Sequence, residues 1–392
     1  MSKNPRDPVV VAAVRTAGTK ARKGGFKDTR PDDLLIAAIK GLVEKVPTFD
    51  TALIDDVVIG TATPEGEQGM NIARIAALGA GLPDSAPAMT INRFCSSGLQ
   101  SLAQAGAAIQ AGWYDVAVTG GVESMTMLGM GGDRPSANPK IMAERPEIYV
   151  TMGMTSENVA RRFGVTREEQ DAFAVSSHDK AAKAIAEGKF SDEIIPVETR
   201  VFDGNGWKDV TIDTDDGVRA GSTVESLGKL RPVFAKDGTT TAGNASQVTD
   251  GAAATLVMAR EKAEAMGLPI LGVLRSYKVV GVDPEIMGIG PKEAIPAAVE
   301  KAGLKLGDID LFEINEAFAS QAVYCSRELG LDMDKVNVNG GAIALGHPLG
   351  CTGAKLTATL LHEMKRRGSR YGVVSMCIGG GMGAAAVFER EG

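Results

Sequence analysis

Two stretches of this 392-residue chain, one near each end, carry the same order of apolar segments. In the first, a run of β-branched residues at 7–16 precedes helical apolar spacing at 31–46, and strand and helix patterns continue to residue 121. The second stretch begins near residue 268 and ends near residue 379, with strand patterns that include 335–341. Strands that alternate with helices predict an α/β fold with a parallel sheet covered on both faces.

The two stretches also keep a nearly constant spacing. Gly98 and Gly353 are 255 residues apart, and Tyr114 and Tyr371 are 257 residues apart. We therefore predict a duplicated α/β unit, with chance similarity between generic amphipathic segments as the alternative.

Residues 121–242 interrupt this rhythm with a Gly- and Met-rich segment, one helix pattern at 166–188 and polar, turn-rich sequence. Long insertions between regular elements commonly carry function. We predict three domains, which are a first unit at 1–120 plus 243–270, an inserted loop domain at 121–242 and a second unit at 271–392.

Charge and cysteine usage exclude several classes of protein. With 42 basic and 49 acidic residues, the formal net charge of -7 argues against nucleic-acid binding. No apolar run reaches the ~18–20 residues of a membrane span, and the start lacks the pattern of a cleavable leader. The four cysteines form no C-x-x-C pair, which disfavours zinc and a disulfide scaffold and favours a reducing compartment. We expect a cytoplasmic protein.

Cys95 and His347 are the first candidates for catalysis. Cys95 lies where a strand pattern gives way to a helix pattern, and amide groups at a helix N-terminus favour a thiolate. His347 lies in a glycine-rich segment before Pro348, and imidazole is the usual base for a thiol nucleophile. A buried, inert cysteine is the alternative for Cys95.

Cys377 and Asn315 follow predicted strands. Cys377 ends an apolar run before a glycine-rich turn and could exchange protons with a perturbed pKa. Asn315 and Glu316 lie at a strand's carboxyl end, where open α/β sheets place ligands. The Asn315 amide could hold an oxyanion directly or through water, or it could cap a helix.

Other residues and motifs are poorer candidates. His178 is expected on a solvated helix face, and His362 is expected to pack or to cap. Cys325 and Cys351 do not lie at a strand end beside a glycine-rich turn, as Cys377 does. The glycine-rich segment 379–384 is followed by too little chain for a dinucleotide-binding helix, and 350–355 lacks the lysine of a P-loop.

Four motifs occur in an order that resembles the thiolase family, and the similarity covers essentially the whole chain. They are NRFCSSGLQ, NEAFASQA, NGGAIALGHPLGCTGA and CIGGGMGAA. Other stretches, such as MGMTSENVA and AGNASQVTDGAA, look most like the degradative 3-ketoacyl-CoA thiolases of peroxisomes and bacteria.

The resemblance implies a thiolase fold, in which two βαβαβαββ-like halves form five layers and a loop domain covers the coenzyme A site. It implies CoA-dependent cleavage of 3-ketoacyl-CoA, or the reverse Claisen condensation, without a tightly bound cofactor or a metal. Cys95 would carry the acyl group, His347 would act as base and Cys377 as acid. The Cys95 and Gly379 amides would form one oxyanion hole, and His347 with an Asn315-bound water would form the other.

The same resemblance places the CoA contacts. Arg219 and Ser226 match positions near the nucleotide, with a solvated charged loop as the alternative. Residues that match the pantetheine channel or the acyl end are Ser246, Ala317, Phe318, Met287 and Met152. For Phe318 and Met287, a place in the hydrophobic core is the alternative. Thr151 stands before Met152 where biosynthetic relatives usually have His, which favours longer acyl chains.

Several alternatives stay open at this point. They are a biosynthetic acetyl-CoA acetyltransferase, a decarboxylating ketoacyl synthase and a non-catalytic lipid carrier. Cys377 disfavours the synthase, and the three catalytic residues disfavour the carrier. The resemblance also implies a homodimer or homotetramer, with a hydratase/dehydrogenase as a possible partner.

Overall fold

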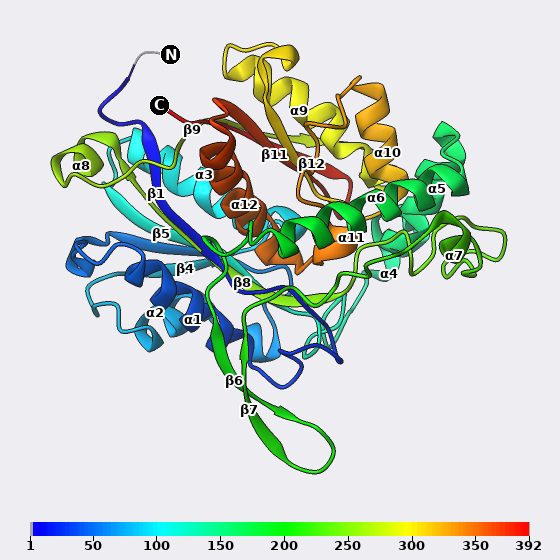
Figure 1. The fold of residues 1–392 in the computed structure, drawn as a ribbon, viewed down its shortest axis with the longest axis horizontal. Helices are drawn as coiled ribbons and strands as arrows, with labels where there is room; N and C mark the ends of the chain where they lie inside the picture. Colours follow the sequence, from blue (N-terminus) through cyan, green and yellow to red (C-terminus); the bar gives the residue numbers. More distant parts are fainter. Residues whose placement is uncertain (1–2, 392) are drawn as a thin grey trace.

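The computed structural model describes residues 3–391 and contains a ten-stranded mixed sheet (Figure 1). A short strand, β2 (Thr19–Lys20), pairs with β8 outside the main path of the sheet. The order along that path is β10 (Leu311–Ile314), β11 (Tyr371–Ile378), β12 (Met382–Glu389), β9 (Gly272–Gly281), β1 (Pro8–Arg15), β8 (Thr249–Ala259), β5 (Val116–Ser124), β3 (Asp56–Gly60) and β4 (Ala88–Ile91).

The two halves of the sheet have matching topology. In one half β10 pairs with β11 in parallel, and β11–β12 and β12–β9 are antiparallel pairs. In the other half β3 pairs with β5 in parallel, and β5–β8 and β8–β1 are antiparallel pairs. The halves meet where β1 pairs with β9. The duplication is therefore confirmed, but the expectation of a parallel sheet is wrong for half of the strands. A tight turn through Gly380 and Gly381, with φ of 80° and 82°, joins β11 to β12 and forces antiparallel pairing.

Helices form three layers around the sheet (Figure 1). α3 (Ser97–Gln110) and α12 (Thr352–Arg367) pack together in a central core between the two halves. α1 (Pro31–Glu44) and α2 (Ile72–Gly79) cover one outer face, and α9 (Gly290–Lys301) covers the opposite one. This is the five-layer arrangement that the sequence predicted.

Two glycines let the central helices meet at their N-termini. A Cβ on Gly353 would lie 2.3 Å from the backbone nitrogen of Leu99, and one on Gly98 would lie 2.8 Å from that of Ala354. Only glycine permits such backbone contact. The start of α3, which follows Cys95, and the start of α12, which follows the His347 segment, are therefore held close together.

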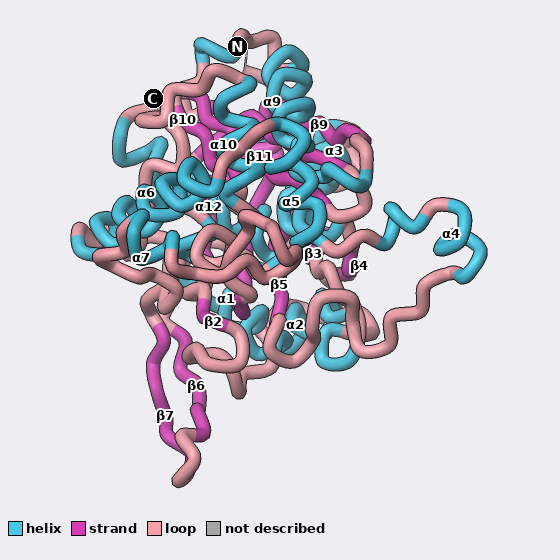
Figure 2. Tube along the Cα trace, turned by 90° about the vertical axis from the view of Figure 1, so that its right-hand side faces the viewer, coloured by secondary structure: helices cyan, strands magenta, loops and turns pink. Residues whose placement is uncertain are grey.

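The remaining elements lie mostly between the two units or beside them. The β6–β7 hairpin extends away from the body, and α4 stands apart on another side (Figure 2). These elements are α4 (Pro139–Glu144), α5 (Met152–Phe163), α6 (Arg167–Ala186), β6 (Val197–Phe202), β7 (Trp207–Ile212), α7 (Val224–Gly228), α8 (Arg260–Ala265), α10 (Ala319–Glu328) and α11 (Ala342–Leu345).

Two local predictions are wrong. Residues 335–341 form no strand, and Val336 makes only an isolated bridge to Phe312. His178 is buried rather than solvated, because α10 and α11 pack on α6 and the 215–219 segment covers the ring, where the Arg219 backbone N–H donates to Nδ1 at 3.2 Å.

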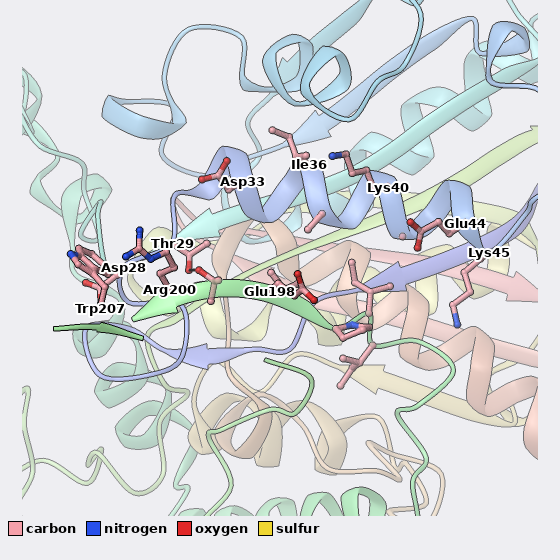
Figure 3. A pocket seen from close by; sticks show the side chains of 17 residues that line it. Asp28, Thr29, Asp33, Ile36, Lys40, Glu44, Lys45, Glu198, Arg200 and Trp207 are labelled. Carbon is pink, nitrogen blue, oxygen red and sulfur yellow. Dashed lines mark hydrogen bonds between the residues drawn. The ribbon is translucent and has the colours of Figure 1, made fainter. Parts of the chain in front are cut away.

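A groove of about 990 Å³ lies between α1 and β6 (Figure 3). Asp33, Ile36 and Lys40 of α1 face Glu198 and Arg200 of β6 across it. None of the twelve predicted site residues lines this groove, so it is separate from the predicted catalytic site. Across residues 3–391, no helix is both long and apolar enough to cross a membrane.

Candidate active site

Cys95 lies in a short 3-10 turn, Phe94–Ser96, directly before α3. The preceding residue, Phe94, has a φ of 44°, which is uncommon for a residue with a side chain. The turn contacts β11 and a second 3-10 turn, Leu349–Cys351, at the start of α12. Cys95 is 6% exposed, so its sulfur lies at the bottom of the site where both halves meet.

Burial raises the pKa of the Cys95 thiol to about 11. Hydrogen bonds from the backbone N–H groups of Gly379 and of Cys95 itself act in the opposite direction but are weaker. The amide N–H groups favour the thiolate, as expected, but loss of solvation outweighs them, so the free enzyme holds Cys95 as a thiol. Cys95 needs a base to remove its proton.

His347 follows α11 and Gly346 and is held on both sides of its ring. Its Nδ1 lies 2.6 Å from the hydroxyl of Thr352, and its Nε2 lies 3.3 Å from Nδ2 of Asn315. Because the Thr352 hydroxyl donates to the carbonyl of Pro348 at 3.0 Å, it accepts from Nδ1–H. Nε2 therefore carries the lone pair, and it accepts a hydrogen bond from Nδ2–H of Asn315. Burial, with a smaller contribution from Lys355, lowers the His347 pKa to about 3, so the ring is a neutral base.

Asn315 lies directly after β10, and its backbone N–H donates to the carbonyl of Ser375 on β11. Its Nδ2 faces His347, while its buried Oδ1 has no hydrogen-bond partner among the described residues. Buried polar atoms are normally satisfied, so this oxygen is available to a water or a substrate. The helix-cap alternative is not realised, since α10 begins later, at Ala319.

Cys377 lies on β11 two residues after Ser375 and is fully buried. Burial raises its pKa well above the usual value, and the charge of a Cys95 thiolate would raise it further. The strand then ends in the turn that contains Gly379, whose N–H points at Cys95. Two thiols and two amide donors thus share one site.

The predicted channel residues gather beside Cys377. Met287, Ala317 and Phe318 form one apolar cluster with it, and Met152 packs against that cluster. Ser246 is tied to the same place, because its backbone N–H donates to the carbonyl of Ala317 at 3.0 Å.

Arg219 and Ser226 lie outside this cluster. Both are exposed, and each is held locally: the Arg219 guanidinium donates to the carbonyl of Ala242, and the Ser226 hydroxyl donates to that of Thr223 in the capping box of α7. Their contact with a nucleotide stays a prediction, as do the domain boundaries.

Sequence reasoning missed several residues that shape the site. The buried Glu123, at the end of β5, accepts N–H groups of Ala62 and Gly350 at 2.8 and 2.7 Å and so ties the two units together. Thr352 and Lys355 hold the His347 segment. An acidic residue at a strand end was the only sequence signal for Glu123. Within the described part of the chain, no group of three or more His, Cys, Asp or Glu residues could hold a metal ion.

Comparison with known proteins gives consistent matches over nearly the full length. The "Thiolase, N-terminal domain" profile matches residues 8–261 and the "Thiolase, C-terminal domain" profile matches residues 268–390. "3-ketoacyl-CoA thiolase 2, peroxisomal" of Arabidopsis thaliana is 58% identical over 390 residues, 98% of this chain and 84% of the relative. The 3-ketoacyl-CoA thiolase of Bacillus subtilis (strain 168) is 56% identical over 389 residues, 98% and 99% of the two chains.

A solved structure agrees with these sequence matches. The dimeric peroxisomal thiolase of Saccharomyces cerevisiae superimposes with a TM-score of 0.91 at 45% identity and covers 100% of this chain and 99% of its own. Both halves, the sheet order and the full length are thus accounted for by a single family. The chain belongs to the thiolase family.

Proposed function

We propose that this chain has 3-ketoacyl-CoA thiolase (acetyl-CoA C-acyltransferase) activity in fatty acid β-oxidation. It would cleave 3-ketoacyl-CoA with CoA to give acetyl-CoA and an acyl-CoA shortened by two carbons. The observation that carries the proposal is the meeting of Cys95, Cys377 and the Gly379 amide in one buried site, with the neutral His347 held by Thr352 at the start of α12. No tightly bound cofactor is needed for these steps.

The first half-reaction forms an acyl-enzyme. Nε2 of His347 takes the Cys95 proton, and the sulfur attacks the 3-keto carbon of the substrate. When the C2–C3 bond breaks, its electron pair goes to C2 and gives the enolate of acetyl-CoA, while the acyl group stays on Cys95. The Cys377 thiol then protonates C2, a role that its raised pKa suits because it keeps the proton until the enolate forms.

The second half-reaction returns the enzyme to its starting state. The Cys377 thiolate takes the proton of a second CoA thiol, and the CoA sulfur attacks the Cys95 thioester. The Cys95 sulfur leaves and recovers its proton from His347. Each thiol and the imidazole therefore end with the protons they began with.

Negative charge develops on oxygen in both halves. The N–H groups of Cys95 and Gly379, which already point at the sulfur, would donate to the oxyanion at the attacked carbon. His347 and a water on Asn315 would stabilise the thioester oxygen of the enolate, and the unpartnered Asn315 Oδ1 supports this assignment. Removing one such donor typically costs about 3 kcal/mol of transition-state stabilisation.

The CoA contacts form part of the proposal. The acyl and pantetheine arms would run along the apolar cluster of Met287, Ala317 and Phe318, beside Met152 and Ser246. The nucleotide would lie near the exposed Arg219 and near Ser226 of α7. Cationic and hydroxyl donors at a surface suit a phosphate-bearing ligand.

Assembly and location are also proposed. The sheet-edge strand β4 and its surroundings expose Met70, Ile75, Leu78 and Phe94, which supports a homodimer or a dimer of dimers. A hydratase/dehydrogenase is the proposed partner enzyme. All four cysteines are free thiols, which supports a reducing, cytoplasmic location.

A steady-state assay of CoA-dependent cleavage tests the function. We expect turnover of both 3-ketohexadecanoyl-CoA and acetoacetyl-CoA. Cleavage of acetoacetyl-CoA alone would select the biosynthetic acetyl-CoA acetyltransferase instead. No cleavage of either substrate, with CoA binding retained, would contradict the enzymatic proposal.

A further inference from the structure

A buried lysine that the proposed reaction does not use contacts the backbone directly before the proposed catalytic histidine. Lys355 is in the first turn of α12, three residues after Thr352, and only 4% exposed. Its Nζ donates to the carbonyls of Leu345 and Gly346, at 2.5 and 3.2 Å. These two residues directly precede His347 in the chain.

The contact completes the end of a helix. Leu345 is the last residue of α11, and the final carbonyls of a helix have no partner within it. Lys355 caps them, while the Gln247 side chain caps the carbonyls of Ile343 and Ala344. The carbonyl groups of residues 343–346 are therefore held by two side chains, the buried Lys355 and the half-buried Gln247.

The backbone at this point has little freedom. Gly346 has a φ of 83°, and a Cβ there would lie 2.4 Å from the hydroxyl oxygen of Thr249. That hydroxyl accepts the backbone N–H of His347 at 3.0 Å. The chain therefore turns sharply just before His347, and the Lys355 ammonium group holds this turn by binding its carbonyl oxygens.

Burying an ammonium group is costly unless it is paired. Lys355 faces the carboxylates of Asp215 and Glu193, the guanidinium of Arg15 and the thiol of Cys351, which come from four different segments. Arg15 already binds Asp215 through two hydrogen bonds, at 2.8 and 2.9 Å, and Glu193 through a third. Two cations therefore face two carboxylates in this buried cluster, so their four formal charges balance, and a neutral side chain at position 355 would disturb that balance.

We propose that Lys355 is a positioning residue for the thiolase reaction, which fixes the Leu345–His347 turn and so holds the His347 ring in place. The inference rests on the proposed function, because it takes His347 to be the base. Thr352 selects the tautomer from the same helix face, one turn earlier.

Electrostatics act in the same direction as the geometry. Two effects lower the pKa of His347. Burial is the larger, and the charge of Lys355 is the one contribution from a charged group among residues 3–391. Burial lowers the pKa of Lys355 itself to about 8. Raising the pH through 8 therefore removes the charge in the unmodified enzyme, without any mutation.

The test is ¹⁵N NMR of the enzyme labelled at its three histidines, His178, His347 and His362. In the wild-type enzyme we expect His347 to remain neutral at pH 5, with its proton on Nδ1. In Lys355→Met the His347 titration should move up by about one pH unit. Lys355→Arg keeps a charged donor and should restore the wild-type titration.

Kinetics separate positioning from general stability. We expect Lys355→Met to lower kcat about tenfold, an effect typical of a misplaced base, with the KM for CoA unchanged. A Lys355→Met enzyme with wild-type kcat and an unshifted His347 titration would overturn the proposal.

A measurement on the wild-type enzyme covers the case in which Lys355→Met does not fold. Between pH 7 and 9.5 the His347 ring signals should shift with a midpoint near the Lys355 pKa of about 8. Signals that stay constant over that range would contradict the proposal. The NMR result does not depend on turnover, so it fails independently of the proposed function.

Discussion

Cys95 and Cys351 occupy equivalent places in the two halves, and their surroundings differ. Each ends or nearly ends a 3-10 turn before a central helix, and the two helices meet at Gly98 and Gly353. Cys95 remains 6% exposed with two amide N–H groups at its sulfur. Cys351 is 1% exposed and packs against Ala253 and Ala354. Duplication thus supplied the same turn and helix start twice, and the two copies differ in that Cys95 has amide donors at its sulfur and a slightly larger exposed fraction.

The proposed base, His347, comes from the second half rather than the first. His347 lies four residues before Cys351, so the second half supplies the imidazole where the first half supplies the thiol. Glu123 of the first half holds the Gly350 backbone of the second at 2.7 Å. The site therefore exists only where both halves meet, and this arrangement can be tested by changing one half at a time.

Replacing Cys95 should have the largest effect on turnover. We expect Cys95→Ala to lower kcat at least about 10⁴-fold, because the acyl group has no other acceptor. Thiolysis of 3-ketohexadecanoyl-CoA measures the effect. Residual turnover within tenfold of wild type would assign the nucleophile elsewhere.

The next largest difference is expected in how the alkylation rates of Cys95 and Cys351 depend on pH. With a pKa of about 11, the Cys95 thiolate fraction rises tenfold per pH unit, so its iodoacetamide rate should rise about 10³-fold between pH 7 and 10. Cys351, with a pKa raised to about 12 and a buried sulfur, should stay unmodified. A rate plateau for Cys95 below pH 9 would point to a preformed thiolate.

Separating the two helices should harm both stability and turnover. A Cβ in Gly353→Ala would meet the Leu99 backbone at 2.3 Å, and we expect a loss of about 1–3 kcal/mol in the free energy of unfolding. Because Cys95 and His347 would move apart, kcat should fall about 10²-fold.

Gly307→Ala is the matched control for that variant, since no heavy atom lies within 4 Å of a Cβ there. It should leave denaturant unfolding and kcat unchanged. Equal effects of the two substitutions would show that the helix contact does not set the catalytic geometry.

The smallest effect is expected for the second cysteine. Cys351→Ala removes one buried sulfur atom and should cost about 1 kcal/mol in unfolding free energy, with kcat within about twofold of wild type. A loss of turnover comparable to that of Cys95→Ala would mean that the two positions are functionally equivalent.

Local patterns explain what could be predicted. Apolar periodicity located β1, α1, α3 and α12. The residue types beside strand ends made Cys95, Cys377 and Asn315 candidates, and a glycine-rich segment did so for His347. The family motifs then gave the five layers. Such features depend on neighbours in sequence, which a single chain displays directly.

Long-range contacts explain what could not be predicted. His178 is buried because α6 has a second covered face, which periodicity alone does not show. The Glu123–Gly350 hydrogen bond spans 227 residues. The pKa of Cys95 also depends on burial by residues distant in the sequence, and this effect, which the local helix-terminus argument does not include, raises the pKa.

Intact-protein mass spectrometry with peptide mapping tests the central claim most directly. After 3-ketohexadecanoyl-CoA is mixed with the enzyme in the absence of free CoA, a tetradecanoyl adduct should appear on the peptide that contains Cys95. Addition of CoA should remove it. An adduct confined to Cys351 or Cys377, or turnover without any covalent adduct, would contradict the account.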